Sequence, residues 1–404
     1  MGLDDYKGIS EAGELRAIEY MAEKLRGRSF LHVNSTATGG GVAELMQRII
    51  PLIRELGIDA KWKVIKGNKQ FFEVTKRIHN SLQGQAGPLT DKMWETYEKV
   101  NKKNGEKINL DADCVFIHDP QPAMLIDQKK RGIWVWRCHI DISTPDKVMW
   151  YLLKDQVKKY DAAIFSVASF AQSLPMPQYM IPPSIDPFSD KNIDLSEAEI
   201  DEVFERFKVP RDKPILLQVS RFDPFKDPIG VIESFKMVKK YYDCTLVLAG
   251  GTADDDPEGE KILADVMEAA EGVEDLHILL LPPFSDKEIN ALQRGATIVI
   301  QKSTREGFGL VVAEALWKNK PVIAGDVGGI PLQVIDGVTG HLVHSVEGCA
   351  VRIRQLLQDP IKARNMGIMG REHIRRNYLI TGHIRKYLAL WLSMENPGQD
   401  VINL

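Results

Sequence analysis

Short apolar runs alternate with amphipathic stretches along almost the whole chain, and this alternation limits the fold more than any other feature. Parallel strands cannot be joined by tight turns, so each buried strand needs a long crossover, usually a helix, before the next. Apolar runs typical of buried strands occupy residues 29–34, 60–65, 114–118, 134–139 and 162–166, and then 215–220, 245–249, 276–281, 297–301 and 321–324. This order predicts an α/β protein with two doubly wound parallel sheets.

The segments between these runs are predicted to be helices and turns. Residues 42–56, 228–242 and 286–295 have helical periodicity, residues 71–107 are polar and helical, and an acidic stretch ending at Glu205 is typical of a surface helix. Glycines mark tight turns within residues 327–331 and 335–340.

The length of the chain and one proline-rich segment predict where it divides. At 404 residues the chain exceeds the size at which a single core stops growing, so two domains are expected. Residues 182–187 (PPSIDP) are extended and turn-rich, which predicts a boundary near Asp186, between residues 1–186 and residues 187–378. A last helix is predicted at about 379–404, and its periodicity fits packing on either domain.

Composition excludes several classes of protein. Hydrophobic residues make up 44% and charged residues 27%, which is typical of a soluble globular chain. The net charge of −4 argues against a nucleic-acid partner, and no apolar run approaches the length of a membrane span. The acidic amino terminus lacks a signal-peptide pattern, so a cytoplasmic enzyme is expected. The four cysteines are widely spaced and predict reduced thiols: Cys114, Cys138, Cys244 and Cys349.

Two glutamates flank a glycine-rich junction between a strand and a helix. Residues 303–316 read STREGFGLVVAEAL, so Glu306 lies in the loop and Glu314 in the early helix. In open α/β sheets, ligands bind at such junctions. Amides at the helix start can hold hydroxyl or phosphate oxygens, and Glu314 can accept hydrogen bonds from a vicinal diol, which points to a sugar nucleotide. An ordinary loop glutamate with a helix glutamate is an equally good explanation of these two residues alone.

Two cations follow the first strand of the second half. Residues 218–227 read QVSRFDPFKD, which places Arg221 and Lys226 beyond the carboxyl end of that strand. A guanidinium and an ammonium together can neutralise a departing pyrophosphate. The alternative is a pair of solvated surface cations beside Asp223 and Asp227. Their position at a strand end favours the phosphate site.

Three glycines, Gly39, Gly40 and Gly41, follow the first strand and open the first helix. Glycine lets the backbone approach a ligand closely, although a plain glycine turn also explains them. The segment lacks the spacing of a dinucleotide fingerprint and the Lys-Ser/Thr of a P-loop.

Polar side chains also end two strands of the first half. Residues 118–122 read HDPQP and residues 137–141 read RCHID, so two histidines and two aspartates are expected at one edge of the sheet. His139 is suited to donate to a sugar hydroxyl while Asp119 or Asp141 orients an acceptor. A structural role for each residue is the alternative. A divalent metal site is the weakest of the three explanations, because the spacing matches no familiar metal motif.

Together these motifs resemble the retaining glycosyltransferases of the GT-B fold, family four. The resemblance implies two facing Rossmann-like domains with a cleft between them, the second holding a nucleotide-sugar donor and the first an acceptor. It also implies a carboxy-terminal helix that returns to the first domain, and no required metal or cofactor. Within the family, residues 32–44 (HVNSTATGGGVAE), 118–122 and 136–141 (WRCHID) resemble the trehalose glycosyltransferring synthases, and also the retaining trehalose phosphorylases.

The resemblance assigns roles by position. For the donor it implies that Arg221 and Lys226 bind the phosphates, that Glu314 binds the ribose, and that Glu306 binds the transferred glucose. The remaining donor contacts that it implies are Gly40, Gly41, Gly307, Phe308, Gly309 and Leu310. His139 would contact the glucose 6-hydroxyl, and the acceptor candidates are Asp119, Gln121 and Asp141. Catalysis would then rest on His139, Arg221, Lys226 and Glu306.

The reaction expected from this resemblance is transfer of glucose from a nucleoside-diphosphate glucose, such as UDP-glucose or ADP-glucose, to free glucose, giving trehalose. The alternatives are a trehalose phosphorylase that uses inorganic phosphate, a non-catalytic nucleotide-sugar binding protein, and a metal-dependent hydrolase. Small sugars are the expected partners, and the sequence is compatible with a homodimer.

Overall fold

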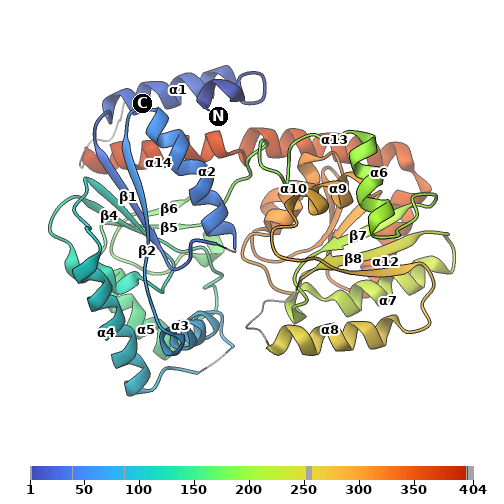
Figure 1. Ribbon diagram of the computed structural model, residues 1–404, viewed down its shortest axis with the longest axis horizontal. Coiled ribbons are helices and arrows are strands. Elements are labelled where there is room, and N and C mark those ends of the chain that lie inside the picture. Colours follow the sequence, from blue (N-terminus) through green and yellow to red (C-terminus); the bar gives the residue numbers. More distant parts are fainter. Residues whose placement is uncertain (1, 39, 86, 252–256, 397, 399–404) are drawn as a thin grey trace. The chain divides into compact units, whose positions relative to one another are not determined.

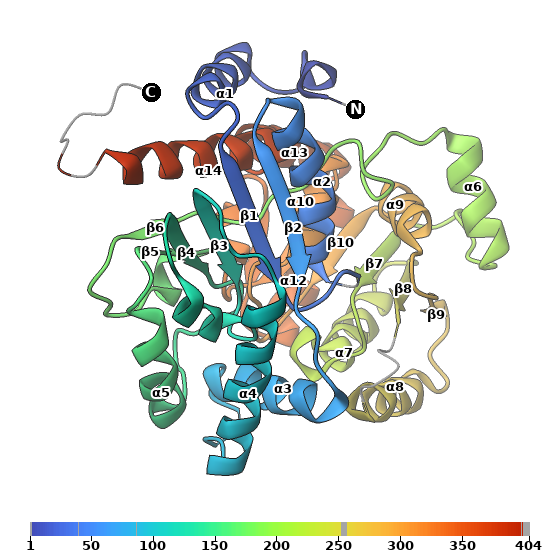
Figure 2. The same ribbon diagram turned by 60° about the vertical axis from the view of Figure 1, so that its left-hand side comes forward.

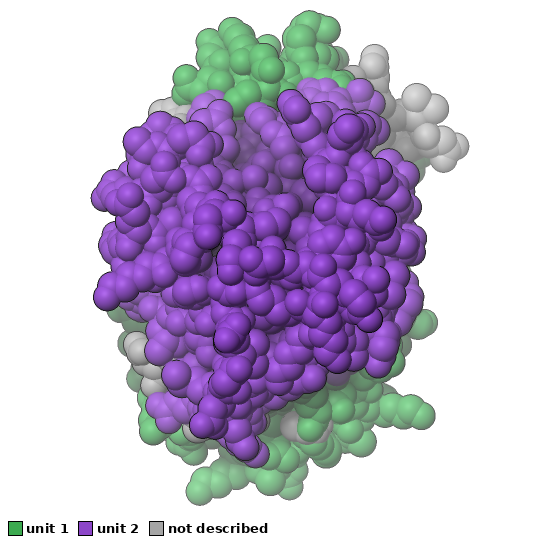
Figure 3. Space-filling model, turned by 90° about the vertical axis from the view of Figure 1, so that its right-hand side faces the viewer, with its two compact units in different colours: residues 1–184, 380–404 green, residues 185–379 purple. Residues whose placement is uncertain are grey.

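The computed structural model describes the chain except residues 1, 39, 86, 252–256, 397 and 399–404. The chain divides into two compact units, residues 1–184 with 380–404 and residues 185–379 (Figure 3). Each unit is described by itself below. No helix in the described part of the chain is both long enough and apolar enough to cross a bilayer.

The first unit is built on a six-stranded parallel sheet with the order β2-β1-β3-β4-β5-β6 (Figure 2). Its strands are β1 (Ser29–Asn34), β2 (Asp59–Val64), β3 (Cys114–His118), β4 (Ile133–Arg137), β5 (Ala162–Phe165) and β6 (Gln178–Met180). Residues of β3 are buried along its whole length, which is why its sequence is a continuous apolar run instead of an alternating one.

Helices cover both faces of this sheet (Figure 1). They are η1 (Leu3–Tyr6), α1 (Ala12–Lys24), α2 (Gly41–Glu55), α3 (Lys69–Leu82), α4 (Asp91–Lys107), η2 (Ala123–Gln128), α5 (Lys147–Val157), η3 (Ala168–Phe170) and α14 (Ile380–Glu395). The last helix, α14, packs against α1 and α2, while α3 packs against α4 and α5. Helix α2 buries Met46, Ile49 and Ile53 along one stripe, as expected for a helix laid on a sheet.

The second unit repeats this architecture with the strand order β12-β11-β10-β7-β8-β9, again all parallel. Its strands are β7 (Ile215–Val219), β8 (Thr245–Gly250), β9 (Leu276–Leu280), β10 (Ile298–Gln301), β11 (Val322–Gly325) and β12 (Gly340–Val343). Its helices are α6 (Glu197–Arg206), η4 (Pro224–Lys226), α7 (Pro228–Lys239), α8 (Pro257–Ala270), α9 (Asp286–Gly295), α10 (Leu310–Trp317), α11 (Ile330–Gln333), α12 (Val346–Gln358) and α13 (Pro360–Asn377). Helix α7 packs against α8 and α12, and α10 packs against α13.

Two doubly wound parallel sheets are what the alternating sequence pattern predicts, and the structure confirms this fold class. Each apolar run named above coincides with a strand to within two residues at either end. Strands β6 and β12 were not predicted, because β6 has only three partly exposed residues and β12 begins at a glycine assigned to a turn. The polar segment 71–107 forms two helices, α3 and α4, capped by the side chains of Asn68 and Thr90.

The winding order fixes where each sheet can hold a ligand. In the second unit the chain runs from β7 outward to β9 and then returns to β10 on the other side of β7. In the first unit it returns in the same way from β2 to β3, on the other side of β1. In open α/β sheets, ligands bind at such switch points, at the carboxyl ends of the strands.

Candidate active site

The loops after β7 and β10 meet at the switch point of the second sheet. Strand β10 pairs with β7 in the register Ile298 to Leu216, so both strands end at the same edge. The Thr304 amide, in the loop after β10, donates to the carbonyl oxygen of Phe225, in the loop after β7, over 2.8 Å. The two loops therefore form one connected surface.

Lys226 and Glu306, which are far apart in the sequence, form an ion pair on this surface. Lys226 Nζ lies 2.6 Å from Glu306 Oε2, and the two side chains are only 17% and 11% exposed. Ser303 Oγ donates to the same carboxylate oxygen over 3.3 Å, and Gln218 Nε2 holds the Lys226 carbonyl at 2.7 Å. A largely desolvated pair of this kind interacts more strongly than one in water. The Lys226 ammonium can also bind an anion, and the Glu306 carboxylate can accept a hydrogen bond from a hydroxyl group.

Arg221 takes a different position from the one expected for a two-cation clamp. Its side chain is 63% exposed, and its nearest carboxylate is Asp223, with Nη2 to Oδ2 at 3.5 Å. Asp223 in turn caps η4 by accepting from the Phe225 amide over 2.8 Å. The structure thus brings Lys226 to Glu306 and leaves Arg221 at the solvent-exposed rim.

A second ion pair beneath this loop was not found from the sequence. Lys302, which is almost fully buried, contacts the Asp227 carboxylate. Asp227 has a left-handed backbone with φ of 48° and caps α7 by accepting from the Gly230 amide over 3.0 Å. The Asp-Pro pair at residues 227–228 is a signal of a helix start and points to the cap, although not to its lysine partner.

Glycines shape the loop that carries Glu306. Gly309 precedes α10 with a left-handed φ of 78°, and Gly328 has φ of 56°. A Cβ atom on Gly328 would lie 1.7 Å from the Glu306 carbonyl oxygen, so only glycine fits there. The Gly329 amide donates to the Gly307 carbonyl over 2.9 Å. Residues 327–331, which the sequence marks only as a turn, therefore support the backbone of the Gly307–Gly309 loop.

Glu314 lies on α10 and is 4% exposed. One turn later, Lys318 donates from Nζ to the Glu314 carbonyl oxygen and to Asn192 Oδ1, each over 3.0 Å. Burial lowers the pKa of Lys318, while the charge of Glu314 acts in the opposite direction. Lys318 was not predicted, because a lysine on a helix is usually solvated and only the packing shows that this one is buried.

In the first unit, His139 is the outer member of a row of three imidazoles. His32 Nδ1 lies 2.9 Å from His118 Nε2, and His118 Nδ1 lies 3.0 Å from His139 Nε2. His32 and His118 lie within β1 and at the end of β3, on either side of the switch point. His139 is partly exposed, and its amide donates to Asp119 Oδ1 over 2.7 Å. The predicted residues His118, Asp119 and His139 are thus brought together.

The other residues predicted in the first unit are more dispersed. Asp141 Oδ1 accepts from the Ser143 amide over 2.9 Å, and Gln121 Oε1 is buried without a hydrogen-bond partner. Gly40 caps α2 with φ of 90°, and Gly41 is the first residue of that helix. Gly39 lies outside the described residues. The glycine segment therefore begins a helix at the carboxyl end of β1, as the sequence predicts.

Comparison with known proteins places the chain in a family. A model of the trehalose synthase N-terminal domain matches residues 32–172, and a model of the group 1 glycosyl transferases matches residues 199–373. The trehalose synthase of Pyrococcus horikoshii is 45% identical over 403 residues, which cover 97% of this chain and 96% of that protein. The chain belongs to the trehalose synthase family. It is therefore a glycosyltransferase.

The chain also resembles more distant proteins, namely a trehalose phosphorylase and a solved trehalose-phosphate synthase. A trehalose phosphorylase from Pleurotus pulmonarius is 29% identical and covers 99% of this chain, but only 62% of that protein is matched. A solved α,α-trehalose-phosphate synthase (UDP-forming) from Burkholderia xenovorans has a TM-score of 0.71 at 12% identity, covering 90% of this chain and 100% of that one. At such low identity the likeness shows the fold alone, which is the GT-B fold.

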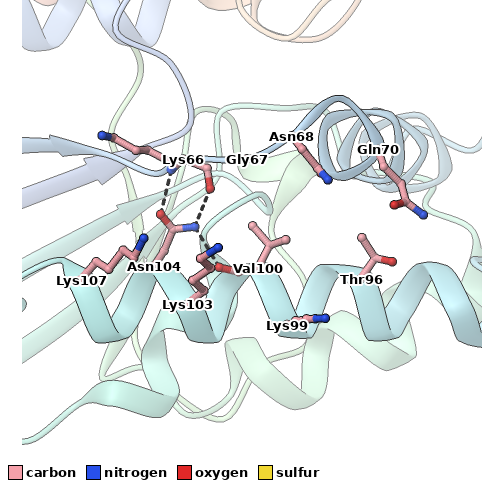
Figure 4. A pocket seen from close by; sticks show the side chains of 10 residues that line it. All are labelled: Lys66, Gly67, Asn68, Gln70, Thr96, Lys99, Val100, Lys103, Asn104 and Lys107. Atoms are coloured by element: carbon pink, nitrogen blue, oxygen red, sulfur yellow. Dashed lines mark hydrogen bonds between the residues drawn. The ribbon is translucent and has the colours of Figure 1, made fainter.

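This member of the trehalose synthase family also has a basic groove that contains none of the predicted site residues. The groove has a volume of about 410 Å³ and lies between α4 and the segment that joins β2 to α3 (Figure 4). The buried Asn104 side chain forms its floor by bonding both the amide and the carbonyl of Lys66, at 2.7 and 2.8 Å. Its lining lysines are Lys66, Lys99, Lys103 and Lys107. Among the residues that the structure describes, no three His, Cys, Asp or Glu side chains gather as metal ligands.

Asp119 gives a prediction about stability and pH. Burial raises the pKa of its carboxyl from 3.8 to about 6, against the opposite effect of the His139 amide. The folded state therefore binds this proton more tightly than the unfolded state, so its contribution to stability is complete below about pH 4 and is lost as pH rises through about 6. In Asp119→Asn, urea unfolding measured between pH 4 and 7 should show a shallower loss of stability.

Asparagine tolerates the left-handed φ of 66° at position 119, so this variant does not add backbone strain. The matched control is Asp155→Asn, which removes an exposed carboxylate from the same unit. An unchanged pH slope in Asp119→Asn would contradict the assignment.

Proposed function

We propose that this glycosyltransferase transfers glucose from a nucleoside-diphosphate glucose to free glucose, with retention of the anomeric configuration, and thereby forms trehalose. The observation that carries the proposal is the Lys226–Glu306 pair, 2.6 Å apart at the switch point of the second sheet. A cation for phosphate and a carboxylate for sugar hydroxyls are adjacent there, as a sugar nucleotide requires. The name of the Pyrococcus horikoshii relative supports trehalose as the product.

The donor is proposed to lie along the loop from Lys226 to α10. Lys226 binds the diphosphate, and Arg221, exposed at the rim, closes on it when the donor is bound. Glu306 and the amides of Gly307, Phe308 and Gly309 hold the glucose. The start of α10 at Leu310 follows, and Glu314 binds the ribose. The second unit, residues 185–379, would then be the donor-binding domain.

The first unit is proposed to bind the acceptor glucose and the sugar being transferred. His139 contacts the transferred glucose, and Gly40 and Gly41 approach the donor phosphate and the acceptor at the start of α2. Asp119, Gln121 and Asp141 are the acceptor contacts. Gln121 supports this role because its buried Oε1 has no partner within the described protein, so a ligand hydroxyl would satisfy it.

The proposed mechanism relies on electrostatics and positioning. Negative charge grows on the diphosphate as its bond to the glucose breaks, and Lys226 and Arg221 stabilise that charge. A phosphate oxygen of the leaving group accepts the proton of the incoming acceptor hydroxyl on the same face of the sugar. The configuration is then retained without a nucleophilic carboxylate. Neither a metal nor another cofactor enters these steps.

Phosphorolysis of trehalose is the second candidate, favoured by the 29% identity to the Pleurotus pulmonarius phosphorylase. In that reaction Lys226 would bind one inorganic phosphate in place of a diphosphate. The synthase relative is 45% identical and the phosphorylase 29%, so the greater similarity supports the synthase. Binding of a nucleotide sugar without turnover is the third candidate.

A substrate screen separates the candidates. The chain is incubated with UDP-, ADP- or GDP-glucose and glucose, and the products are analysed for nucleoside diphosphate and a non-reducing disaccharide. The proposal expects both in equal amounts, with and without chelator. Glucose 1-phosphate formed from trehalose and phosphate, with no reaction of any sugar nucleotide, would instead establish the phosphorylase. Loss of turnover on chelation would contradict the metal-free mechanism.

The cellular location and the partners of the enzyme are proposed from its composition. With 27% charged residues and a net charge of −4, it is expected in the cytoplasm without nucleic-acid or membrane partners. A homodimer is compatible with this composition.

A further inference from the structure

Three histidines of the first unit, His32, His118 and His139, form a continuous hydrogen-bonded row that ends at the proposed sugar contact. His32 is completely buried, and its ring packs beside those of Phe30 and Phe116 at centroid distances of 4.3 and 5.3 Å. Its Nδ1 contacts His118, whose other nitrogen contacts His139. His118 is also completely buried. Two imidazoles with no access to solvent therefore lie directly behind His139.

Burial disfavours the charged form of all three rings. Burial lowers the pKa of His32 to about 3 and lowers the pKa of His118 and His139 well below the usual value. The guanidinium of Arg137, which is itself completely buried, lowers the pKa of both His118 and His139 further. A neutral imidazole carries one proton, so each ring has one donor and one acceptor nitrogen.

This restriction couples the three tautomers. If His118 donates from Nδ1 to His139, its Nε2 must accept from Nδ1 of His32, and all three rings carry their proton on Nδ1. If the row runs in the opposite direction, all three carry it on Nε2. A mixed arrangement would put two protons, or none, between one pair of nitrogens that are 2.9 or 3.0 Å apart. The tautomer of His139 is thus fixed by residues that never touch a substrate.

The inner end of the row favours one direction. His32 Nε2 is buried and has no hydrogen-bond partner in the described protein. With the proton on Nδ1, this atom is an unpartnered acceptor, whereas in the opposite direction it is an unpartnered N–H among aromatic rings. Buried N–H groups without an acceptor are rarer in folded proteins than acceptors without a donor. This difference favours the direction from His32 toward His139.

We propose that His32 and His118 are positioning residues that hold His139 as the Nδ1–H tautomer, so that His139 presents a hydrogen-bond donor to an oxygen of the transferred sugar. The role of the sugar rests on the proposed function, but the tautomer does not. Four of the six ring nitrogens form the two hydrogen bonds of the row, and His32 Nε2 is buried without a partner in the described structure. His139 Nδ1 is the remaining nitrogen.

The decisive measurement is the nitrogen NMR spectrum of the whole chain labelled with ¹⁵N-histidine, in the absence of substrate. The chain has nine histidines, so the His139 signals are assigned by comparison with His139→Gln. The proposal expects a proton on Nδ1 of His32, His118 and His139. A proton on Nε2 of His139 would overturn it. The tautomer is read from the wild-type protein. His139→Gln serves only to assign signals, and its fold is checked by the unchanged positions of the other histidine signals.

Kinetics of two substitutions then connect the tautomer to the reaction. His118→Leu removes the donor, while His118→Asn keeps an amide N–H near the position of Nδ1. His118→Leu should lower kcat by about three- to tenfold, the effect of one neutral hydrogen bond, with little change in the KM for the acceptor. His118→Asn should recover most of that loss, and the exposed His344→Leu should have no effect. Equal activity in both His118 variants would contradict a positioning role.

The tautomer and the proposed function can fail separately. A proton on Nδ1 of His139 in a chain that makes no disaccharide would leave the tautomer assignment intact and reject the trehalose-forming reaction. Disaccharide formation by a chain with the proton on Nε2 would reject only the inference about His32 and His118.

Discussion

Replacing Lys226 by alanine is expected to lower kcat by about 10²- to 10³-fold, which is the typical cost of removing one preorganised group from developing negative charge. The ammonium is held at 2.6 Å from Glu306 and is 17% exposed, so water cannot easily replace it. The effect should appear in kcat more than in donor KM, because the charge on the diphosphate grows as the glycosidic bond breaks. Initial rates at saturating sugar nucleotide and glucose measure it.

Two further variants separate charge from packing in this prediction. Lys226→Arg keeps a cation of different shape and should recover part of the rate, whereas Lys226→Met keeps the length and should not. The matched control is Lys129→Ala, because Lys129 also has a carboxylate partner at 2.6 Å, Asp161, but lies in the first unit outside the proposed site. Wild-type turnover in Lys226→Ala would remove Lys226 from the mechanism.

A loss of activity in this variant has to be distinguished from unfolding. Without its cation, the carboxylate of Glu306 keeps the Ser303 hydroxyl as a hydrogen-bond donor at 3.3 Å. Removing one partner of a buried ion pair costs about 3–5 kcal/mol. A folded domain of ordinary stability tolerates that cost. Rates are therefore compared well below the midpoint of thermal unfolding, with the unfolding curve of each variant as the control.

The sequence predicts the fold well because strands buried in parallel sheets have a distinctive apolar sequence pattern. Strands such as β3 are buried on both faces and read as unbroken apolar runs, separated by stretches long enough for a crossover helix. Strand β6 is an edge strand of three residues, and its partly exposed side chains give no such run. Strand β12 starts at Gly340, where a Cβ would lie 2.4 Å from the Val322 carbonyl. This close packing requires glycine at position 340, and in the sequence that glycine is interpreted as part of a turn.

The candidate site is only partly predictable, for a different reason. Strand ends and loop chemistry point to Lys226, Glu306 and His139 as candidates, because polar groups at the carboxyl ends of parallel strands contrast with the apolar runs before them. Their partners depend on packing between segments that are distant in the chain. His32 lies inside β1 and looks like a core residue, and only the register with β3 brings it to His118. The Lys302–Asp227 pair likewise requires the folded loops.

Gly328→Ala is expected to reduce activity by about a hundredfold, although the residue has no proposed contact with substrate. The new Cβ would lie 1.7 Å from the Glu306 carbonyl and 3.1 Å from the Gly307 carbonyl, both of them backbone atoms, so the loop must move. Misplacement by about 1 Å at a site that orients reactants is enough to cost about 10²-fold. The rate at saturating substrates and the free energy of unfolding in urea are both measured.

The matched control for Gly328→Ala is Gly272→Ala, in the same unit. Gly272 has φ of 71°, comparable with 56° at Gly328, but a Cβ there meets nothing within 4 Å. Both variants carry the strain of a left-handed alanine, about 1–2 kcal/mol, and only Gly328→Ala carries the steric clash. Gly272→Ala should therefore lose stability and keep its turnover, while Gly328→Ala should lose more stability together with its activity. Equal turnover in the two variants would mean that the backbone of the Glu306 loop is not the element that positions the sugar.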